Sequence, residues 1–311
     1  MPSISTSFLP ATSAQTILTA LPSQDVDQRP ILRGDTMIIE ALSLLQTSGF
    51  LIHPVPIQDE QSEHHGQFFS LEALLRSLPP SKTPRIPTMS LDQWFSGPGQ
   101  MLKEGGLIPP HPILLSPHAP FSRVLSILIA HSSQYIILEP SSPSSSSSSS
   151  PKTLTQGNLL RFLLINNHRL PPHLLDSPLS NLPSLPISPI SPPYSAPHLV
   201  SAMKEACDAT IHSLFLLPRP HTSLPPMELT LPTLLSWLHD PPATLEDQDQ
   251  CPPPLLVSSS FTLSQCMAAM VRFHQFQAWV CHPSLDDLPS RIITISHLLT
   301  FMAPHLVPEA W

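Results

Sequence analysis

Residues 153–164 read TLTQGNLLRFLL, and this stretch joins two kinds of periodicity without an intervening loop. Its first half alternates as a β-strand does, with Leu154 between Thr153 and Thr155. Its second half has a helical pattern, with leucines and a phenylalanine on one face and an arginine on the other. The sequence therefore predicts a strand that runs directly into a helix, with Gly157 in the turn between them.

The same strand-to-helix signature occurs three more times along the chain. Each copy has a short apolar strand that ends in Ser or Thr, followed by a helix rich in Leu. The copies are FFSLEALLRSL (68–78), ELTLPTLLSWL (228–238) and IITISHLLTFM (292–302). The residues that end the four strands are Ser70, Thr155, Thr230 and Thr294.

Each signature is preceded by an amphipathic helix and then a strand. The helical patterns cover 35–50, 119–133, 196–210 and 262–276, and the strands cover 53–58, 135–139, 213–218 and 278–283. Asp35, Ser195 and Thr262 are suitable N-cap residues for three of these helices. The chain therefore reads as four repeats of leading strand, helix, two strands and helix. One repeat cannot bury two helices and a small sheet, so the repeats are expected to pair.

This pattern resembles four CBS motifs over roughly residues 30–305. The resemblance implies an α/β (α+β) fold of two tandem CBS-motif pairs, each motif being a small sheet with two helices. It is similar to the gamma subunit of AMP-activated protein kinase and to the fungal CBS proteins that inhibit protein phosphatase type 2A. The run at 155–164 is closer to the second group.

The resemblance divides the chain into motifs and connections. The four motifs are expected at 30–80, 108–170, 196–240 and 253–305, after an N-terminal extension at 1–29. Connections are expected at 81–107, 171–195 and 241–252, and a Ser-rich disordered insert at 141–151.

In the resembled family, an Asp three residues after the strand-end Ser or Thr binds the ribose hydroxyls of an adenine nucleotide. A carboxylate suits this role because it can accept two hydrogen bonds from a vicinal diol. The matching positions are Ala73, Asn158, Thr233 and His297, and none of them is an acid. The family's phosphate contacts are Arg or His on the preceding strand, and those positions are matched by His53, Gln134, His212 and Gln277.

The candidate nucleotide contacts are therefore Asn158, Thr155, Thr230, Thr294, His297 and His53, with AMP, ADP or ATP as the implied ligand. The ordinary alternative for each of these histidines is a packed or exposed side chain beside an apolar strand, and that alternative is the more common one. The four replaced acids count against nucleotide binding.

The composition excludes several other classes of function. The net charge is -8 and basic residues are not clustered, which argues against a nucleic-acid surface. No phosphate-binding glycine motif, no H-E-x-x-H and no G-x-S-x-G are present, so the chain is not expected to be an enzyme. Cys207, Cys251, Cys266 and Cys281 lack zinc-ligand spacing and are expected to be buried thiols.

No apolar run reaches the length of a membrane span, and the first 28 residues contain no Lys or Arg. We therefore expect no membrane association and a cytoplasmic or nuclear protein. Only 12% of residues are charged, about half of the usual share. This low charge is consistent with a surface that a protein partner covers.

The sequence thus predicts a non-catalytic regulatory or adaptor protein. The resemblance implies a kinase or phosphatase complex as its partner, and a homodimer formed through the CBS pairs. One alternative is a gamma-type subunit that senses adenine nucleotides. Another is a scaffold controlled by phosphorylation of its Ser-Pro pairs, at Ser116, Ser142, Ser150, Ser177, Ser188 and Ser191.

Overall fold

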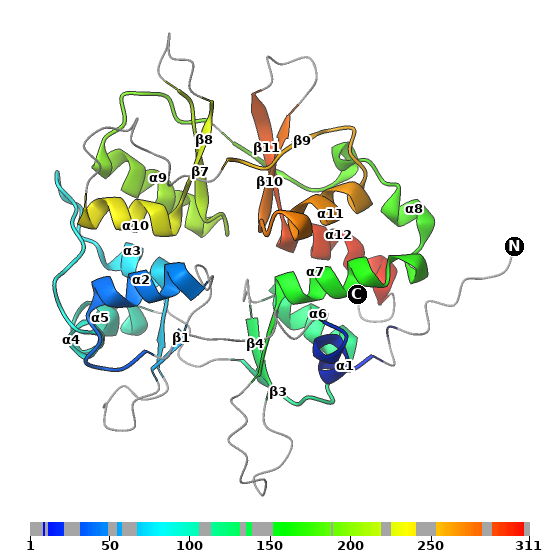
Figure 1. Ribbon diagram of the computed structural model, residues 1–311, viewed down its shortest axis with the longest axis horizontal. Helices are drawn as coiled ribbons and strands as arrows, with labels where there is room; N and C mark the ends of the chain where they lie inside the picture. The colour runs from blue at the N-terminus through cyan, green and yellow to red at the C-terminus, as the bar shows by residue number, and fades with distance from the viewer. Residues whose placement is uncertain are drawn as a thin grey trace, which may run out of the picture. The chain divides into compact units, whose positions relative to one another are not determined.

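The computed structural model describes residues 9, 12–21, 32–48, 55–57, 67–105, 113–130, 135–138, 152–187, 189–218, 225–240, 253–281 and 288–307. The chain forms two compact units (Figure 1). Unit 1 comprises Met1–Asp27, Ile113–Ser188 and Leu255–Trp311. Unit 2 comprises Gln28–Pro112 and Pro189–Pro254.

Unit 1 contains the second and fourth motifs, which have the same element order. The second motif is β3 (Leu114–Leu115), α6 (Phe121–Ala130), β4 (Tyr135–Leu138), β5 (Lys152–Thr155) and α7 (Gln156–Ile165). The fourth motif is β9 (Leu256–Ser258), α11 (Leu263–Arg272), β10 (Gln277–Cys281), β11 (Pro289–Thr294) and α12 (Ile295–Leu306). In both motifs the leading strand pairs in parallel with the next strand, which forms an antiparallel hairpin with the third.

Unit 2 contains the first and third motifs, which follow the same plan. The first motif is α2 (Ile38–Ser48), β1 (Val55–Pro56), β2 (Phe68–Phe69) and α3 (Leu71–Ser77). The third motif is α9 (Ala196–Asp208), β7 (Ser213–Leu216), β8 (Met227–Thr230) and α10 (Leu231–His239). Single parallel bridges, Leu32 with Ile57 and Ile190 with Leu216, stand where unit 1 has leading strands. The predicted fourfold repeat is confirmed.

Apolar helix faces build one core in each unit. On α6, Phe121, Val124, Leu125 and Leu128 are all fully buried, at the spacing of one helix face. In unit 1, α7 packs against α11 and α12, and in unit 2, α10 packs against α2, α3 and α9. Each unit therefore combines motifs that are not neighbours along the chain.

The connection predicted at 81–107 contains two helices in its described part, which the sequence did not predict. It forms α4 (Leu91–Ser96) and α5 (Pro98–Glu104). Ser90 and Gln93 make a capping box at the start of α4. Trp94 is fully buried, its ring meets Phe69 edge-on at 5.5 Å between centroids, and its indole N–H donates to Ser77 Oγ at 3.2 Å. This segment is therefore part of the core of unit 2.

The N-terminal extension and the Pro/Ser-rich connection at 171–195 also belong to the folded units. The extension contributes α1 (Ala14–Thr19), which buries Ile17 and Leu18 in the core of unit 1. The second connection contains η3 (Asn167–Arg169) at its approach, then α8 (Pro172–Leu175), η4 (Leu179–Asn181) and β6 (Leu185–Pro186). Strand β6 pairs antiparallel with β11, and Ile190 bridges to β7, so these residues extend two sheets.

The predicted insert at 141–151 and the connection at 241–252 lie outside the described residues. Within the part of the chain that the structure describes, no helix has both the length and the apolar character that a membrane crossing requires.

Replacing Trp94 with Ala should destabilise unit 2 by about 3 to 5 kcal/mol, because the change leaves a large cavity and removes the hydrogen bond from the indole to Ser77 Oγ. Urea unfolding followed by far-UV circular dichroism would measure the loss. The matched control is Met101→Ala on α5, whose side chain is 75% exposed and should matter little. Equal losses for the two variants would show that this segment does not contribute to the core.

Candidate functional site

The four strand-end hydroxyls cap the helices that follow them. Each accepts a hydrogen bond from the backbone N–H three residues later, at 3.1 Å for Ser70, 3.0 Å for Thr155, 3.4 Å for Thr230 and 3.3 Å for Thr294. They start α3, α7, α10 and α12 respectively. The hydroxyls satisfy N–H groups that have no partner within the helix.

The residues at the ribose-contact positions are the third residues of these helices. Asn158 turns its side chain back: its Oδ1 accepts from the Thr155 backbone N–H at 2.9 Å and from the Thr155 hydroxyl at 2.7 Å. His297 does the same with Nδ1, which accepts from the Thr294 backbone N–H at 3.1 Å. The side-chain Oδ1 of Asn158 and Nδ1 of His297 are therefore the acceptor atoms of two capping boxes.

The other two third-position residues have fewer polar atoms that could contact a ribose. The Thr233 hydroxyl lies 2.8 Å from the Thr230 hydroxyl, and Ala73 has no polar side chain. None of the four positions therefore presents a carboxylate to a vicinal diol.

His297 is held neutral by its surroundings. Burial lowers the pKa of His297, and because Nδ1 accepts a backbone N–H, the ring proton must lie on Nε2. A neutral imidazole gives no positive charge for a phosphate group.

In unit 1, Phe276 contacts both helix starts that carry candidate residues. Its carbonyl accepts from the Ile295 N–H, the first residue of α12, at 3.0 Å. Its ring lies 3.5 Å from the position that a Cβ on Gly157 would occupy, at the second residue of α7. An apolar ring therefore lies beside a helix N-terminus, where an anion is otherwise favoured.

Unit 2 has the corresponding contact with different chemistry. The carbonyl of His212 accepts from the Leu231 N–H, the first residue of α10, at 2.8 Å. Its ring Nε2 lies 3.6 Å from Glu72 Oε2, and Glu72 is the second residue of α3. His212 and Glu72 thus occupy the positions that Phe276 and Gly157 occupy in unit 1. Here the start of α3 already has a carboxylate of the chain itself.

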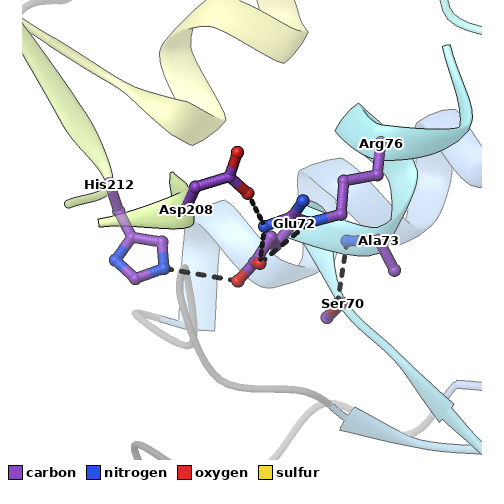
Figure 2. Close-up of polar contacts among 6 residues, drawn as sticks. All are labelled: Ser70, Glu72, Ala73, Arg76, Asp208 and His212. Atoms are coloured by element: carbon purple, nitrogen blue, oxygen red, sulfur yellow. Dashed lines mark hydrogen bonds and ion pairs between the residues drawn. The ribbon is translucent and has the colours of Figure 1, made fainter. Parts of the chain in front are cut away.

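Glu72 and His212 belong to a four-residue charged cluster that joins the first and third motifs (Figure 2). Arg76 Nη2 lies 2.8 Å from Glu72 Oε1 and 2.7 Å from Asp208 Oδ1. Burial opposes the charge on Glu72, but the close His212 ring and the hydrogen bonds from Arg76 outweigh it and lower the pKa of the carboxyl. Burial likewise opposes the charge on Arg76, and its two carboxylate partners raise the pKa of the guanidinium.

Two polar pairs were not predicted from the sequence, although the sequence contained a signal for one of them. Glu72 and Arg76 stand four residues apart on a predicted helix, which is the spacing of an ion pair. The other is Glu228 in β8, 1% exposed, which accepts from the Ser213 hydroxyl at 2.6 Å. Only the pairing of β7 with β8 brings these two residues together.

The remaining predicted positions divide into buried, half-buried and undescribed ones. Gln277 is buried at the start of β10, and His53 and Gln134 lie outside the described residues. Cys207 and Cys266 are buried as expected, and burial raises the pKa of both thiols to about 12. Cys281 is only half-buried, which corrects the expectation for that residue, because it lies at the end of β10, and Cys251 lies outside the described residues. Among the described residues, no three His, Cys, Asp or Glu side chains are grouped to hold a metal ion.

No protein family and no curated protein matches the sequence. Among solved structures, one from Methanocaldococcus jannaschii, described as a proposed archaeal homologue of g-AMPK, is similar, with a TM-score of 0.57. The match has 9% identity and covers 90% of this chain and 99% of that one. An uncharacterised conserved protein from Pyrococcus horikoshii has a TM-score of 0.45 at 10% identity, over 93% of this chain and 99% of that one.

The first likeness concerns the fold alone, because the identity is so low. It confirms the predicted fold class, an α/β arrangement of CBS type with small sheets and paired helices. The resemblance to the fungal phosphatase inhibitors stays a prediction.

Replacing His297 with Gln should flatten the pH dependence of stability. Because the pKa of His297 is lowered in the folded state, the unfolded state binds the proton more readily, and stability falls as the pH drops below about 6.5. Gln keeps the cap without titrating, as Gln93 and Gln265 do at the starts of α4 and α11. Urea unfolding of both proteins at about pH 7.5 and 5.5 gives the comparison. An equal loss in the two proteins would contradict the neutral state of His297.

Replacing Arg76 with Met should cost about 1 to 3 kcal/mol, because Glu72 and Asp208 lose their shared partner and Glu72 is half-buried. The control is Arg85→Met, at an exposed arginine of the same unit. Thermal unfolding of the two variants measures the difference. If Arg76→Met melts like the control, the cluster does not stabilise the contact between the first and third motifs.

Proposed function

We propose that this chain is a non-catalytic regulatory or adaptor protein whose folded motifs bind another protein. Its partner is a component of a protein kinase or phosphatase complex, as the resemblance to CBS proteins implies. The chain uses its four-motif framework for protein contact rather than for nucleotide sensing.

The observation that carries this proposal is the kind of side chain that lies at the first turns of α3 and α7. At α7 the neighbour of the second residue is the Phe276 ring, and at α3 the second residue is Glu72, paired with His212 and Arg76. A phosphate would meet an apolar ring at the first and a carboxylate at the second. Both contacts are unfavourable for an anion.

The third residues of the helices support the same conclusion. Asn158 and His297 point their acceptor atoms at the backbone of their own caps, so binding a ribose there would break a capping box. A broken cap costs about 1 kcal/mol. The contact that binds ribose in the resembled family is therefore replaced by one that stabilises the fold.

The likeness to the archaeal structure favours a second candidate, nucleotide sensing, because that structure is described as a homologue of g-AMPK. The two candidates make opposite predictions for ligand stabilisation.

Millimolar AMP, ADP or ATP should leave the melting temperature of the purified full chain unchanged. A ligand at 100 times its dissociation constant would add about 2.7 kcal/mol, a rise of several degrees. The variant Asn158→Asp should also fail to respond, because Phe276 still lies beside Gly157. A rise for wild type would favour the sensor. A rise for the variant alone would mean that the missing acid was the single obstacle.

The protein-binding part is tested directly by co-elution. The full chain should form a complex with the catalytic subunit of a type 2A phosphatase or with the catalytic and scaffold subunits of an AMP-activated kinase, and should change the activity of that enzyme. The absence of any complex with either would contradict the kinase or phosphatase assignment.

A further inference from the structure

Unit 1 has exposed apolar side chains in and near the turn between α11 and β10. In the turn between them, Phe273 is 58% exposed and Phe276 is 37% exposed. Ile165, the last residue of α7, is 53% exposed. Large apolar side chains that lie in water are informative when they are neighbours.

The contacts between α7 and the turn join these side chains into one surface. Arg161 Nη2 lies 2.8 Å from His274 Nδ1, and the Phe276 ring lies beside Gly157, one helix turn before Arg161. Ile165 follows Arg161 by one further turn of α7. We call this surface, made of Arg161, Ile165, Arg272, Phe273, His274 and Phe276, the α7–α11 patch.

The α7–α11 patch is cationic. Arg272 places its guanidinium 5.7 Å from the centre of the Phe273 ring, and Arg161 is the second guanidinium. Among the described residues of unit 1, Asp176 is the only acid. Its neighbour Ser177 accepts from the N–H of Leu263, at the opposite end of α11 from Arg272. A helix of that length separates the two ends by about 13 Å.

His274 holds a strained backbone to make its contribution. Its φ is 52°, in the left-handed region that favours glycine, and it follows the end of α11. The helix is closed there by the Gln275 N–H, which donates to Met270 O at 2.9 Å. Since a guanidinium can only donate, His274 Nδ1 must accept from Arg161, and this contact orders the arginine. The same conformation ends α9 at Thr210, so it belongs to the helix ending, and the contact with Arg161 is what distinguishes His274.

We propose that the α7–α11 patch binds an acidic segment of a partner protein. Carboxylates of that segment pair with Arg161 and Arg272, and its apolar side chains cover Phe273, Phe276 and Ile165. Phenylalanine and arginine are both enriched at protein interfaces, and pairing with carboxylates supplies the specificity. The proposal rests on the proposed function, since it names the surface at which the adaptor binds its partner.

The test begins with a selection from a random dodecapeptide library on the immobilised full chain. Enriched peptides should combine Asp or Glu with aromatic or aliphatic residues. The fluorescence anisotropy of a labelled winning peptide then gives its affinity for each variant of the full chain. The variants His274→Gly and Phe273→Ser should each weaken binding by about tenfold.

His274→Gly is informative because it relieves strain, so the protein should melt no lower than wild type while binding is lost. The matched control is Thr210→Gly, which removes the same strain at the end of α9, where φ is 60°. That change lies in unit 2 and should leave peptide affinity unaltered.

Three outcomes would overturn the proposal. Enriched peptides without acidic residues would refute the charge pairing. Acidic peptides whose binding ignores His274→Gly and Phe273→Ser would move the contact elsewhere and leave the proposed function standing. A concentration-dependent dimer in sedimentation velocity that Phe273→Ser abolishes would make a second copy the occupant. An absence of both enriched peptides and any kinase or phosphatase complex would instead reject the proposed function itself.

Discussion

The structure depends on one junction, in which a strand residue caps the helix that follows it. At Ser70, Thr155, Thr230 and Thr294 the residue is still extended, yet its hydroxyl already accepts an N–H from the first turn of the helix. With no loop between the elements, the helix cannot slide or rotate against its sheet. The second and third residues of each helix therefore take the same place in all four motifs. Whatever chemistry the protein has at these places is decided by side chains alone.

Units 1 and 2 show that the chemistry at these positions is independent of the repeated backbone. The residue before β10 and the residue before β7 make the same backbone contact, to the first residues of α12 and α10. One of them is Phe276, which faces glycine, and the other is His212, which faces glutamate. The same backbone plan thus supports an apolar contact in unit 1 and a charged one in unit 2. Repetition of the fold does not imply repetition of a binding site.

The strength of the local signals decided how much of this could be predicted from the sequence. The four junctions were predictable because the apolar period changes from two to 3.6 at a Ser or Thr. Helices α4 and α5 were missed because six- and seven-residue elements between prolines carry too few apolar positions to show a period. Strand β6 and the Ile190 bridge were missed for a similar reason: each pairs over only one or two residues, within a run rich in Pro and Ser.

The helix positions of the candidate residues were predictable from the sequence, but the chemistry at those positions was not. Sequence spacing placed Asn158 and His297 at the third helix positions. It could not show that both side chains turn back on their own caps, because Asn and His suit a ligand as well as a cap. The contacts of Phe276 and His212 join motifs that are distant in sequence, so no local pattern could predict them.

The combination of alternate motifs also decides when the protein can fold during its synthesis. The core of unit 2 runs from Leu32 to Leu238, and that of unit 1 from Leu9 to Val307. Neither core is complete when the ribosome has made the first half of the chain. Helices α6 and α7 emerge long before α11 and α12, their packing partners in unit 1. Such long sequence separations slow folding. Until the last motif has been synthesised, the apolar faces of α6 and α7 lack their packing partners and are prone to aggregation.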